Sequence, residues 1–298
     1  VNADVTEITD KDGAVTGVKV KMAKKTKTIS AKAVIDTAGG FGSNMEMITE
    51  YKPELKNYVT TNHKGASGDG IALAEKLGAD TVQMDQIQIH PTVYQEKGKD
   101  PFLVSEAIRG EGAVLINAEG KRFYNEMETR DNVSAAINKL PERSAYVVFD
   151  QQLREHSKSI DTYEEKGMVI KADSIEDLAK KMDVSAENMT ATIDAWNKSV
   201  AAKNDSEFGR TTGMDRDISK GPFYAIKIAP GIHHTMGGLK INTNTEVLKK
   251  DGSAIPGLFA AGEVTGGVHG SNRIGGNAVA DIVVFGRQAG TKAAEFAK

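Results

Sequence analysis

The side chains best suited to acid–base chemistry lie in three short stretches of the first half of the chain. Glu106 and Arg109 stand three residues apart, the spacing of an ion pair on one helix face, and an exposed pair of that kind is common and contributes little to stability. Arg130 is an isolated arginine between Thr129 and Asp131, where a solvated surface charge is the usual interpretation. His90 precedes a proline in an extended segment, and a core or capping histidine is an equally good interpretation. Taken singly, none of these residues indicates a catalytic site.

Two later stretches are better suited to binding an anion. His233 and His234 are adjacent and precede a double glycine, and no neighbouring Cys, Asp or Glu offers the third ligand that a metal site would need. Arg273 lies in a glycine-rich segment ahead of a predicted helix N-terminus, a setting suited to holding a carboxylate through two hydrogen bonds. The alternative for that segment is a flexible connection with a surface arginine. These residues favour anion binding over metal binding, and we predict no metal site.

The elements that must position these residues are strands and helices separated by glycine-rich turns. Alternating apolar residues around a turn at Asp10–Gly13 predict a meander of strands, and a following run ends in Thr37-Ala38-Gly39-Gly40. Because glycine has no Cβ, backbone can approach a ligand closely at such a turn. Strands are predicted at 4–8, 15–22, 27–35, 237–241 and 257–262, and helices at 71–77, 175–182 and 188–201, with a final buried helix running from a glycine turn within 275–286.

Composition narrows the class of protein. At 298 residues the chain is long enough for two domains. With 38 basic and 41 acidic residues the net charge is −3, which produces no large positive field and argues against a nucleic-acid partner. No apolar run approaches the roughly 20 residues that span a bilayer, so we predict no membrane insertion. The absence of cysteine excludes disulfides, thiol nucleophiles and cysteine-ligated metal clusters from these residues.

The charged and glycine-rich stretches also form an ordered set, which resembles a known family. In chain order they are Thr-Ala-Gly-Gly, Gly-Asp-Gly, His-Pro-Thr, Ser-Glu-Ala-Ile-Arg-Gly, Thr-Arg-Asp, His-His-Thr-Met-Gly-Gly, Ala-Gly-Glu and Asn-Arg-Ile-Gly-Gly-Asn-Ala. Over essentially the whole chain this set resembles the flavoproteins of the fumarate reductase and succinate dehydrogenase superfamily, closest to the soluble flavocytochrome c type fumarate reductases.

The resemblance implies a mixed α/β (α+β) fold with two domains. Residues 1–87 and 231–298 would form a partial FAD-binding, Rossmann-like domain, and residues 88–230 an inserted α+β capping domain. The capping domain would move about hinges near Gln88 and Pro230 and close over the flavin.

The resemblance further implies FAD-dependent reduction of fumarate to succinate, with hydride transfer from flavin N5 and proton delivery from Arg130. The ordinary pKa of arginine lies above about 12, so the donor must be reprotonated at once, and Glu106 with Arg109 would do so. The residues that would contact substrate are His90, Ser105, Glu106, His233, Arg273 and Gly276. Those that would line non-covalently bound FAD are Ala3, Thr37, Ala38, Gly39, Gly40, Asp69, His234, Glu263, Asn277, Ala278 and Val279.

Four departures from the family pattern bear on these expectations. Ser105 stands where threonine is expected, which keeps the hydroxyl, and the loop over 94–100 is a few residues longer than expected. The Gly-x-Gly-x-x-Gly motif that would hold the FAD pyrophosphate is missing, as is any Cys-x-x-Cys-His haem motif. We therefore expect a partial chain that holds FAD poorly by itself, with haem possible only in an upstream segment.

Two alternatives to a fumarate reductase stay open. One is a related flavin enoate reductase acting on urocanate or methacrylate, although His90 and Glu106 favour fumarate. The other is a non-catalytic flavoprotein fragment that needs its N-terminal segment. The implied partners are a small dicarboxylate, fumarate or succinate, and an electron donor such as a c-type cytochrome or haem domain. The implied setting is a soluble protein of the periplasm that takes part in electron transport during anaerobic respiration.

Overall fold

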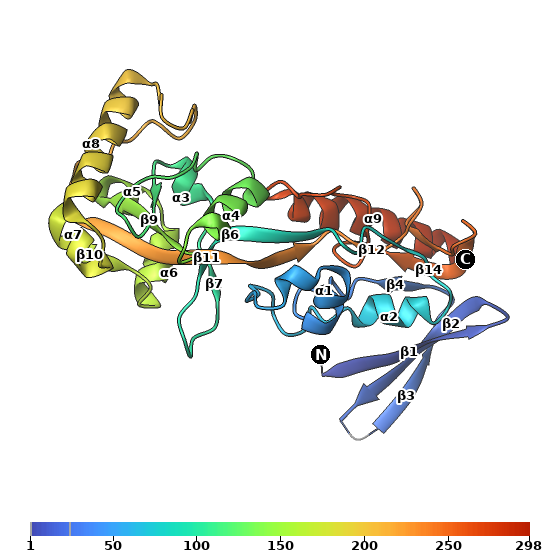
Figure 1. Ribbon diagram of the computed structural model, residues 1–298. Coiled ribbons are helices and arrows are strands. Elements are labelled where there is room, and N and C mark those ends of the chain that lie inside the picture. The colour runs from blue at the N-terminus through green and yellow to red at the C-terminus, as the bar shows by residue number, and fades with distance from the viewer. Residues whose placement is uncertain (1, 24) are drawn as a thin grey trace. The chain divides into compact units, whose positions relative to one another are not determined.

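A computed structural model of the chain describes residues 2–23 and 25–298. The described chain divides into two compact units. One, here called the discontinuous unit, consists of the residues up to Gln88 together with Ile232–Lys298, and the other, the inserted unit, consists of Ile89–Gly231. The predicted mixed α/β fold class is confirmed (Figure 1). The assignment of the two units as FAD-binding and capping domains stays a prediction.

An antiparallel sheet opens the discontinuous unit (Figure 1). Its strands are β1 (Ala3–Lys11), β2 (Ala14–Met22) and β3 (Lys25–Ser30), in the order β1-β2-β3. Asp12 and Gly13 have φ values of 55° and 79°, the left-handed pair that a two-residue type I′ hairpin turn requires. The predicted turn and its two flanking strands are therefore confirmed.

The predicted single strand over 27–35 is wrong, because the backbone leaves this first sheet after Ser30. The Ala31 N–H still donates to the Thr16 carbonyl at 2.9 Å, but the chain then joins another sheet as β4 (Val34–Asp36). In that sheet β4 pairs in parallel with β14 (Ala254–Ala260), and β14 pairs antiparallel with β13 (Glu246–Leu248). The apolar pattern indicates extended backbone along the whole run, but it does not encode which sheet each half joins.

The rest of the discontinuous unit connects these sheets. Asn44 caps the first helix, where its side chain accepts a hydrogen bond from the Met47 N–H at 3.1 Å. The predicted strand at 237–241 is shorter in the structure and pairs with a second short strand. The connecting helices are α1 (Met45–Tyr51), the 3₁₀ helix η1 (Pro53–Leu55) and α2 (Asp69–Glu75), and the two short paired strands are β5 (Thr81–Val82) and β12 (Gly238–Leu239).

The final helix, α9 (Asn277–Phe296), is present as predicted, but the expectation that it is buried is wrong. Ala289 and Ala293 pack against Phe259 of β14, so one face of the helix is covered. The apolar residues on the rest of its first half are exposed: Val279 by 63%, Ile282 by 55%, Val283 by 52% and Val284 by 61%. The apolar run predicts the helix but not which of its faces other residues cover.

The inserted unit is built on one large sheet with the strand order β7-β6-β11-β9-β8, and β10 also pairs with β11. The chain passes between the two units within β6 and β11. The strands are β6 (Ile87–Tyr94), β7 (Phe102–Leu103), β8 (Val114–Ile116), β9 (Ala145–Asp150), β10 (Ile170–Ala172) and β11 (Phe223–Thr235).

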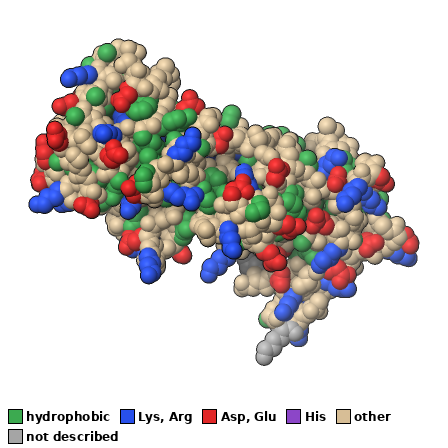
Figure 2. Space-filling view, viewed as in Figure 1, with side chains coloured by type: hydrophobic (Ala, Val, Ile, Leu, Met, Phe, Trp, Pro, Cys, Tyr) green, Lys and Arg blue, Asp and Glu red, His purple; other side chains and the backbone are tan. Residues whose placement is uncertain are grey.

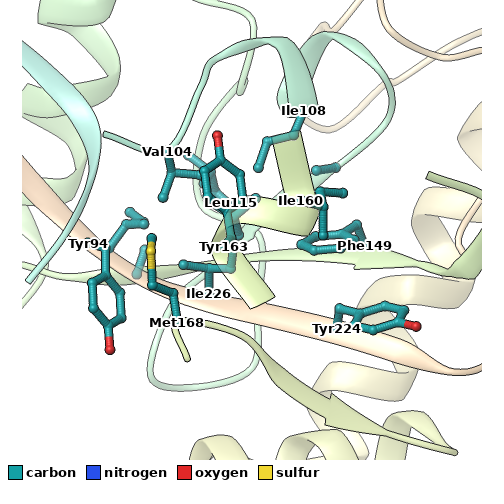
Figure 3. Packing of buried hydrophobic residues seen from close by; sticks show 14 of the residues in the cluster. Tyr94, Val104, Ile108, Leu115, Phe149, Ile160, Tyr163, Met168, Tyr224 and Ile226 are labelled. Atoms are coloured by element: carbon teal, nitrogen blue, oxygen red, sulfur yellow. The ribbon is translucent and has the colours of Figure 1, made fainter. Parts of the chain in front are cut away.

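Side chains alternate along these strands between two hydrophobic cores. On β8 and β9, Leu115 and Val147 belong to one core, whereas their neighbours Val114 and Val148 belong to the other. This is the period of two expected of a sheet that is covered on both faces. Figure 3 shows the first core, in which Tyr163 packs among residues of both strands and helices.

The helices of the inserted unit include two that the sequence predicts well. The Ser174 and Ser185 hydroxyls cap them, accepting from the Asp177 and Asn188 N–H groups at 3.1 and 3.2 Å. The predicted helices at 175–182 and 188–201 are confirmed as α7 and α8. The helices are α3 (Ala107–Gly110), α4 (Arg130–Lys139), α5 (Gln151–His156), α6 (Ser159–Glu165), α7 (Ile175–Met182) and α8 (Ala186–Ala202).

Charged side chains of both signs are interspersed on the face shown in Figure 2. This mixing follows from a nearly balanced composition and leaves no basic track for a nucleic-acid backbone on that face. Among the described helices, none combines the length and the apolar character needed to cross a membrane.

Candidate active site

Glu106 is the centre of a charged cluster in the inserted unit. It is the N-cap residue of α3, Arg109 lies within α3, and Arg130 is the first residue of α4. Arg130 Nε donates to Glu106 Oε2 at 2.7 Å. Arg109 Nη2 and His90 Nε2, the latter from β6, lie 3.8 and 3.7 Å from the same oxygen. Three separate stretches of the sequence thus converge on one carboxylate.

Burial and charge set the protonation states of the cluster. Burial lowers the pKa of His90 to about 4, so its imidazole is neutral near pH 7. His90 and Arg130 hold the pKa of the Glu106 carboxyl well below its usual range, and of the two Arg130 is the closer. Burial also lowers the pKa of Arg109 to about 10, against the opposing effect of Glu106. Two guanidinium groups therefore face one carboxylate and a neutral histidine, and the excess of positive charge suits an anionic ligand.

The hydrogen bond at Nδ1 of His90 identifies the tautomer of its imidazole ring. The Thr92 N–H donates to His90 Nδ1 at 3.2 Å, which assigns Nδ1 as an acceptor without a proton. Thr92 Oγ1 lies 3.3 Å from the same nitrogen but donates its own proton to the Val104 carbonyl at 2.6 Å. The neutral imidazole therefore carries its proton on Nε2, which faces Glu106. Sequence reasoning missed Thr92, although the triplet His-Pro-Thr was the available signal.

A buried ion-pair network supports Arg109. Its Nη1 donates to the backbone carbonyl of Glu126, whose carboxylate accepts from Arg122 Nε and Nη2 at 2.8 Å each and from Arg210 Nη1 at 3.2 Å. Arg210 Nη2 also donates to the Arg109 carbonyl at 2.6 Å. Buried partners of this kind hold one another because the loss of one leaves a charge uncompensated. The sequence gives no sign of this network, since Arg122 and Glu126 lie outside any helix and Arg210 is distant.

Ser105 immediately precedes this cluster and is half-buried. Its Oγ accepts a hydrogen bond from the Ala107 N–H at 3.2 Å. The hydroxyl proton of Ser105 is thus left to donate to a ligand.

His234 and Glu263 form a second histidine–carboxylate pair, in the discontinuous unit. His234 Nδ1 lies 3.1 Å from Glu263 Oε2, and Glu263 Oε1 accepts from the Thr235 N–H at 3.0 Å. Burial opposes ionisation of Glu263, but the hydrogen bonds from His234 and Thr235 lower its pKa nonetheless. His234 Nε2 is buried and has no hydrogen-bond partner among the described residues. Because buried polar atoms are almost always paired, this nitrogen suits a bound ligand.

Gly40 allows the backbone to approach this pair closely. A Cβ at Gly40 would lie 2.1 Å from Thr235 Oγ1 and 2.7 Å from Glu263 Oε1, distances that real atoms do not adopt. The Phe41 N–H donates to Thr235 Oγ1 at 3.3 Å and so ties the glycine turn to the same pair. Glycine at this position is therefore required by the packing of the pair.

The predicted substrate residues of the discontinuous unit are held by neighbours that sequence reasoning did not assign. Thr61 Oγ1 lies 2.9 Å from His233 Nδ1. Gln88 Nε2 donates to the Arg273 carbonyl at 2.6 Å, which fixes the loop that carries this buried arginine. In the sequence, only the position of Gln88 two residues before His90 suggests that Gln88 belongs near the site.

The remaining predicted FAD residues occupy two places in the discontinuous unit. Gly276, with φ of 83°, is the N-cap of α9, and the predicted residues Asn277, Ala278 and Val279 form the first turn. The Asn277 and Val279 N–H groups donate to the Ile274 and Gly276 carbonyls at 3.2 and 2.9 Å. A cavity of about 360 Å³ is lined by several residues, among them the predicted Ala3, Thr37, Ala38 and Asp69.

The predicted site residues thus fall into two sets, one in each unit. Those of the inserted unit are His90, Ser105, Glu106, Arg109 and Arg130, and those of the discontinuous unit are Ala3, Thr37, Ala38, Gly39, Gly40, Asp69, His233, His234, Glu263, Arg273, Gly276, Asn277, Ala278 and Val279. The individual roles of these residues stay predictions. Within residues 2–23 and 25–298, no group of three or more His, Asp or Glu side chains is arranged to hold a metal ion.

Comparison with known proteins gives the family. The family described as FAD binding domain matches residues 1–279. The chain belongs to this family. A solved structure, the open conformation of a flavocytochrome c3 fumarate reductase, matches with a TM-score of 0.79 and 43% identity, over 99% of this chain and 52% of that one. The resemblance to the flavocytochrome c type is confirmed.

Curated relatives agree with this assignment. NADH:fumarate oxidoreductase from Klebsiella pneumoniae (strain 342) is 50% identical over 299 residues, which is 100% of this chain and 32% of the relative. Fumarate reductase (cytochrome) from Shewanella frigidimarina is 44% identical over 290 residues, 97% of this chain and 50% of the relative. Urocanate reductase from Eggerthella lenta is 37% identical over 300 residues, 97% of this chain and 49% of the relative. The chain thus spans about a third to a half of the length of these relatives.

The discontinuous unit of this family member fits a flavin dinucleotide. His234 Nε2 offers a buried polar atom that has no hydrogen-bond partner among the described residues, and Gly40 packs closely against Thr235 and Glu263 beside it. The start of α9 presents the positive end of the helix dipole to a polar ligand. These features suit the polar edge of a flavin.

Proposed function

We propose that the protein is a flavin-dependent reductase that converts fumarate to succinate. The observation that carries the proposal is the convergence of Arg130, Arg109 and His90 on the Glu106 carboxylate, in a chain of the FAD binding domain family. The cluster has an excess of positive charge, and within it Arg130 is hydrogen-bonded to Glu106, so a proton can pass between them. A dicarboxylate that must gain a proton needs both.

Arg130 is the proton donor in this proposal. Its Nε already donates to Glu106 at 2.7 Å, so a proton lost to substrate can be replaced through that carboxylate. Arg109 is the next source, because its pKa of about 10 makes it a better acid than an ordinary arginine. The protein residues thus deliver one proton to one alkene carbon. Bound FAD in its reduced form would supply the hydride to the other.

Binding of the substrate is assigned to donors that stay in a fixed protonation state. His90 offers its Nε2–H as a neutral donor, and Ser105 offers its hydroxyl proton. By the same proposal, His233, Arg273 and Gly276 of the discontinuous unit contact substrate as well. Donors fixed before the reaction need no rearrangement as charge develops beside a carboxylate.

The cofactor is proposed to be FAD held without a covalent bond. The residues that would hold it are Ala3, Thr37, Ala38, Gly39, Gly40, Asp69, His234, Glu263, Asn277, Ala278 and Val279. Denaturing the purified FAD-loaded protein with acid should release all of the flavin into the supernatant. Flavin that stays with the precipitated protein would contradict non-covalent binding.

The electron donor and the compartment are proposed on similarity alone. Two of the relatives are named for NADH and for a cytochrome, so a c-type cytochrome or haem domain is one of two classes of donor. A periplasmic location and a role in anaerobic respiration are proposed by analogy with the flavocytochrome type.

The reaction is tested most directly with an artificial donor, which removes the dependence on the natural one. The FAD-loaded protein is supplied anaerobically with reduced methyl viologen and with fumarate, urocanate, methacrylate or acrylate, and products are identified by NMR. We expect succinate as the main product and oxidation of the dye to match it. Faster reduction of urocanate or methacrylate would replace fumarate with another enoate, and reduction of none would favour a non-catalytic flavoprotein.

A further inference from the structure

A buried tyrosine from a distant helix reaches the backbone of Ser105. The Ser105 N–H donates to the Tyr163 Oη at 2.9 Å. Tyr163 lies in α6, is 3% exposed and belongs to the first core of the inserted unit. Figure 3 shows its ring among Val104, Leu115 and Ile160, with the hydroxyl pointing away from Met168 and Ile226. Nothing in the proposed chemistry uses this hydroxyl.

The residues on either side of Ser105 are anchored by other contacts. Val104 makes two hydrogen bonds to Thr92 of β6. Its N–H donates to the Thr92 carbonyl at 2.9 Å, and its carbonyl accepts from the Thr92 hydroxyl at 2.6 Å. On the other side, Ile108 of α3 is fully buried in the same core. The backbone N–H of Ser105 lies between these anchors, and the phenol oxygen is the acceptor that holds it.

We propose that Tyr163 is a positioning residue, which sets the backbone at Ser105 so that the Ser105 hydroxyl points at a substrate carboxylate. The inference rests on the proposed function, in which Ser105 binds the dicarboxylate. The Tyr163 ring is held edge-on beside Phe102 of β7, with ring centroids 6.2 Å apart, so the phenol oxygen itself has little freedom. The position of a substrate-binding hydroxyl is thereby coupled to the hydrophobic core.

Tyr163→Phe removes only the acceptor and preserves the ring that packs in the core. The Ser105 N–H then lacks its partner, and the segment shifts to find another. We expect the KM for fumarate to rise about ten-fold and kcat to change less than about three-fold, because a binding contact is made in the ground and transition states alike. Tyr146→Phe is the matched control, since it removes a phenol that donates to the Met182 carbonyl at 3.0 Å, away from Ser105.

Coupling to Ser105 is tested with a double-mutant cycle. The dissociation constant of fumarate for the FAD-loaded, oxidised protein is measured by calorimetry for wild type, Ser105→Ala, Tyr163→Phe and the double variant. If Tyr163 acts through Ser105, the two single variants weaken binding and the double variant is no weaker than Ser105→Ala. Independent, multiplying losses would overturn the proposal, as would wild-type affinity in Tyr163→Phe.

Hydrogen exchange at the Ser105 amide gives a readout that does not depend on substrate. Exchange should accelerate at least ten-fold in Tyr163→Phe and stay unchanged in Tyr146→Phe. Equal exchange in wild type and Tyr163→Phe would show that the phenol does not hold this N–H. If the wild-type protein neither binds nor reduces fumarate, the proposed function is wrong. The exchange rate at the Ser105 amide would still show whether Tyr163 holds this N–H.

Discussion

Arg130 and Arg273 lie in different surroundings, and the difference separates a proton donor from a binding group. Arg130 donates its Nε to Glu106, with Arg109 close to the same carboxylate, so a proton that it loses can be replaced. Arg273 is buried on a glycine-rich loop whose backbone Gln88 holds. A contact of that second kind is made in both ground and transition states, whereas a proton is delivered only as the C–H bond forms.

The first prediction follows from this contrast. Arg130→Ala should lower kcat for fumarate reduction by about 10²- to 10⁴-fold, while FAD content and succinate affinity stay near wild type. Arg273→Ala should lower kcat and, unlike Arg130→Ala, should raise the KM for fumarate by about ten-fold or more, since a charge-assisted contact with substrate is lost. Steady-state kinetics with reduced methyl viologen measures both, and Lys139→Ala, an exposed charge at the other end of α4, is the control. An Arg130→Ala enzyme that keeps a tenth of its kcat would exclude Arg130 as the donor.

His90 makes the stability of the protein depend on pH. Burial lowers its pKa to about 4, below the value of about 6.5 in an unfolded chain. Between these values the unfolded chain binds a proton that the folded protein does not, so the free energy of unfolding decreases as pH falls from about 6.5 towards 4. The gap corresponds to about 3 kcal/mol, and this contribution is absent above pH 6.5.

Urea unfolding between pH 4.5 and 7 tests this second prediction. His90→Gln cannot bind the proton, so its free energy of unfolding should decrease less steeply on acidification than that of wild type. His156→Gln, at an exposed position in α5, should keep the wild-type slope. Identical slopes in His90→Gln and wild type would mean that His90 is not held neutral by burial.

At the scale of elements, the turn after β4 decides how closely backbone approaches the His234–Glu263 pair. Gly40→Ala should lower FAD affinity about ten-fold or more, because its Cβ would displace Thr235 and Glu263, and overpacking of this kind costs about 1–3 kcal/mol. Fluorescence titration of FAD measures the loss. Gly290→Ala in α9 meets no neighbouring atom and serves as the control. FAD affinity equal in the two variants would remove Gly40 from the flavin site.

How far the sequence predicts an element depends on how local its determinants are. The turn at Asp10–Gly13 and the helix at 175–182 are determined by residues within a few positions, and both are found as predicted. The break of the run at 27–35 is not predictable, because β4 is defined by its pairing with β14, more than 200 residues away. The exposed face of α9 is missed for the same reason, since periodicity does not say what covers a helix.

The candidate site shows the same limit at the residue level. Glu106, Arg109, Arg130 and His90 are predicted by resemblance, and their convergence on one carboxylate is found in the structure. Their supporting residues are not predicted. Tyr163 is 58 positions from Ser105, and no pattern in the sequence connects the two.

At the scale of the molecule, each unit has a core of its own, and this predicts two separable unfolding events. Leu178 is fully buried in a core of the inserted unit, and Leu258 of β14 is fully buried in the discontinuous unit. Replacing a buried leucine with alanine costs about 2–5 kcal/mol, which is enough to move the midpoint of the unit that contains it. A ligand that binds one unit stabilises that unit by mass action.

The last prediction combines these effects in one calorimetric experiment. Leu178→Ala should lower the midpoint of one transition, Leu258→Ala that of the other, and added FAD should raise only the transition that Leu258→Ala lowers. The reason is that the proposed FAD residues lie in the discontinuous unit, whereas the inserted unit contributes none of them. The chain passes from one unit to the other within β6 and β11. A single transition moved equally by all three changes would mean that these two strands make the chain one cooperative unit.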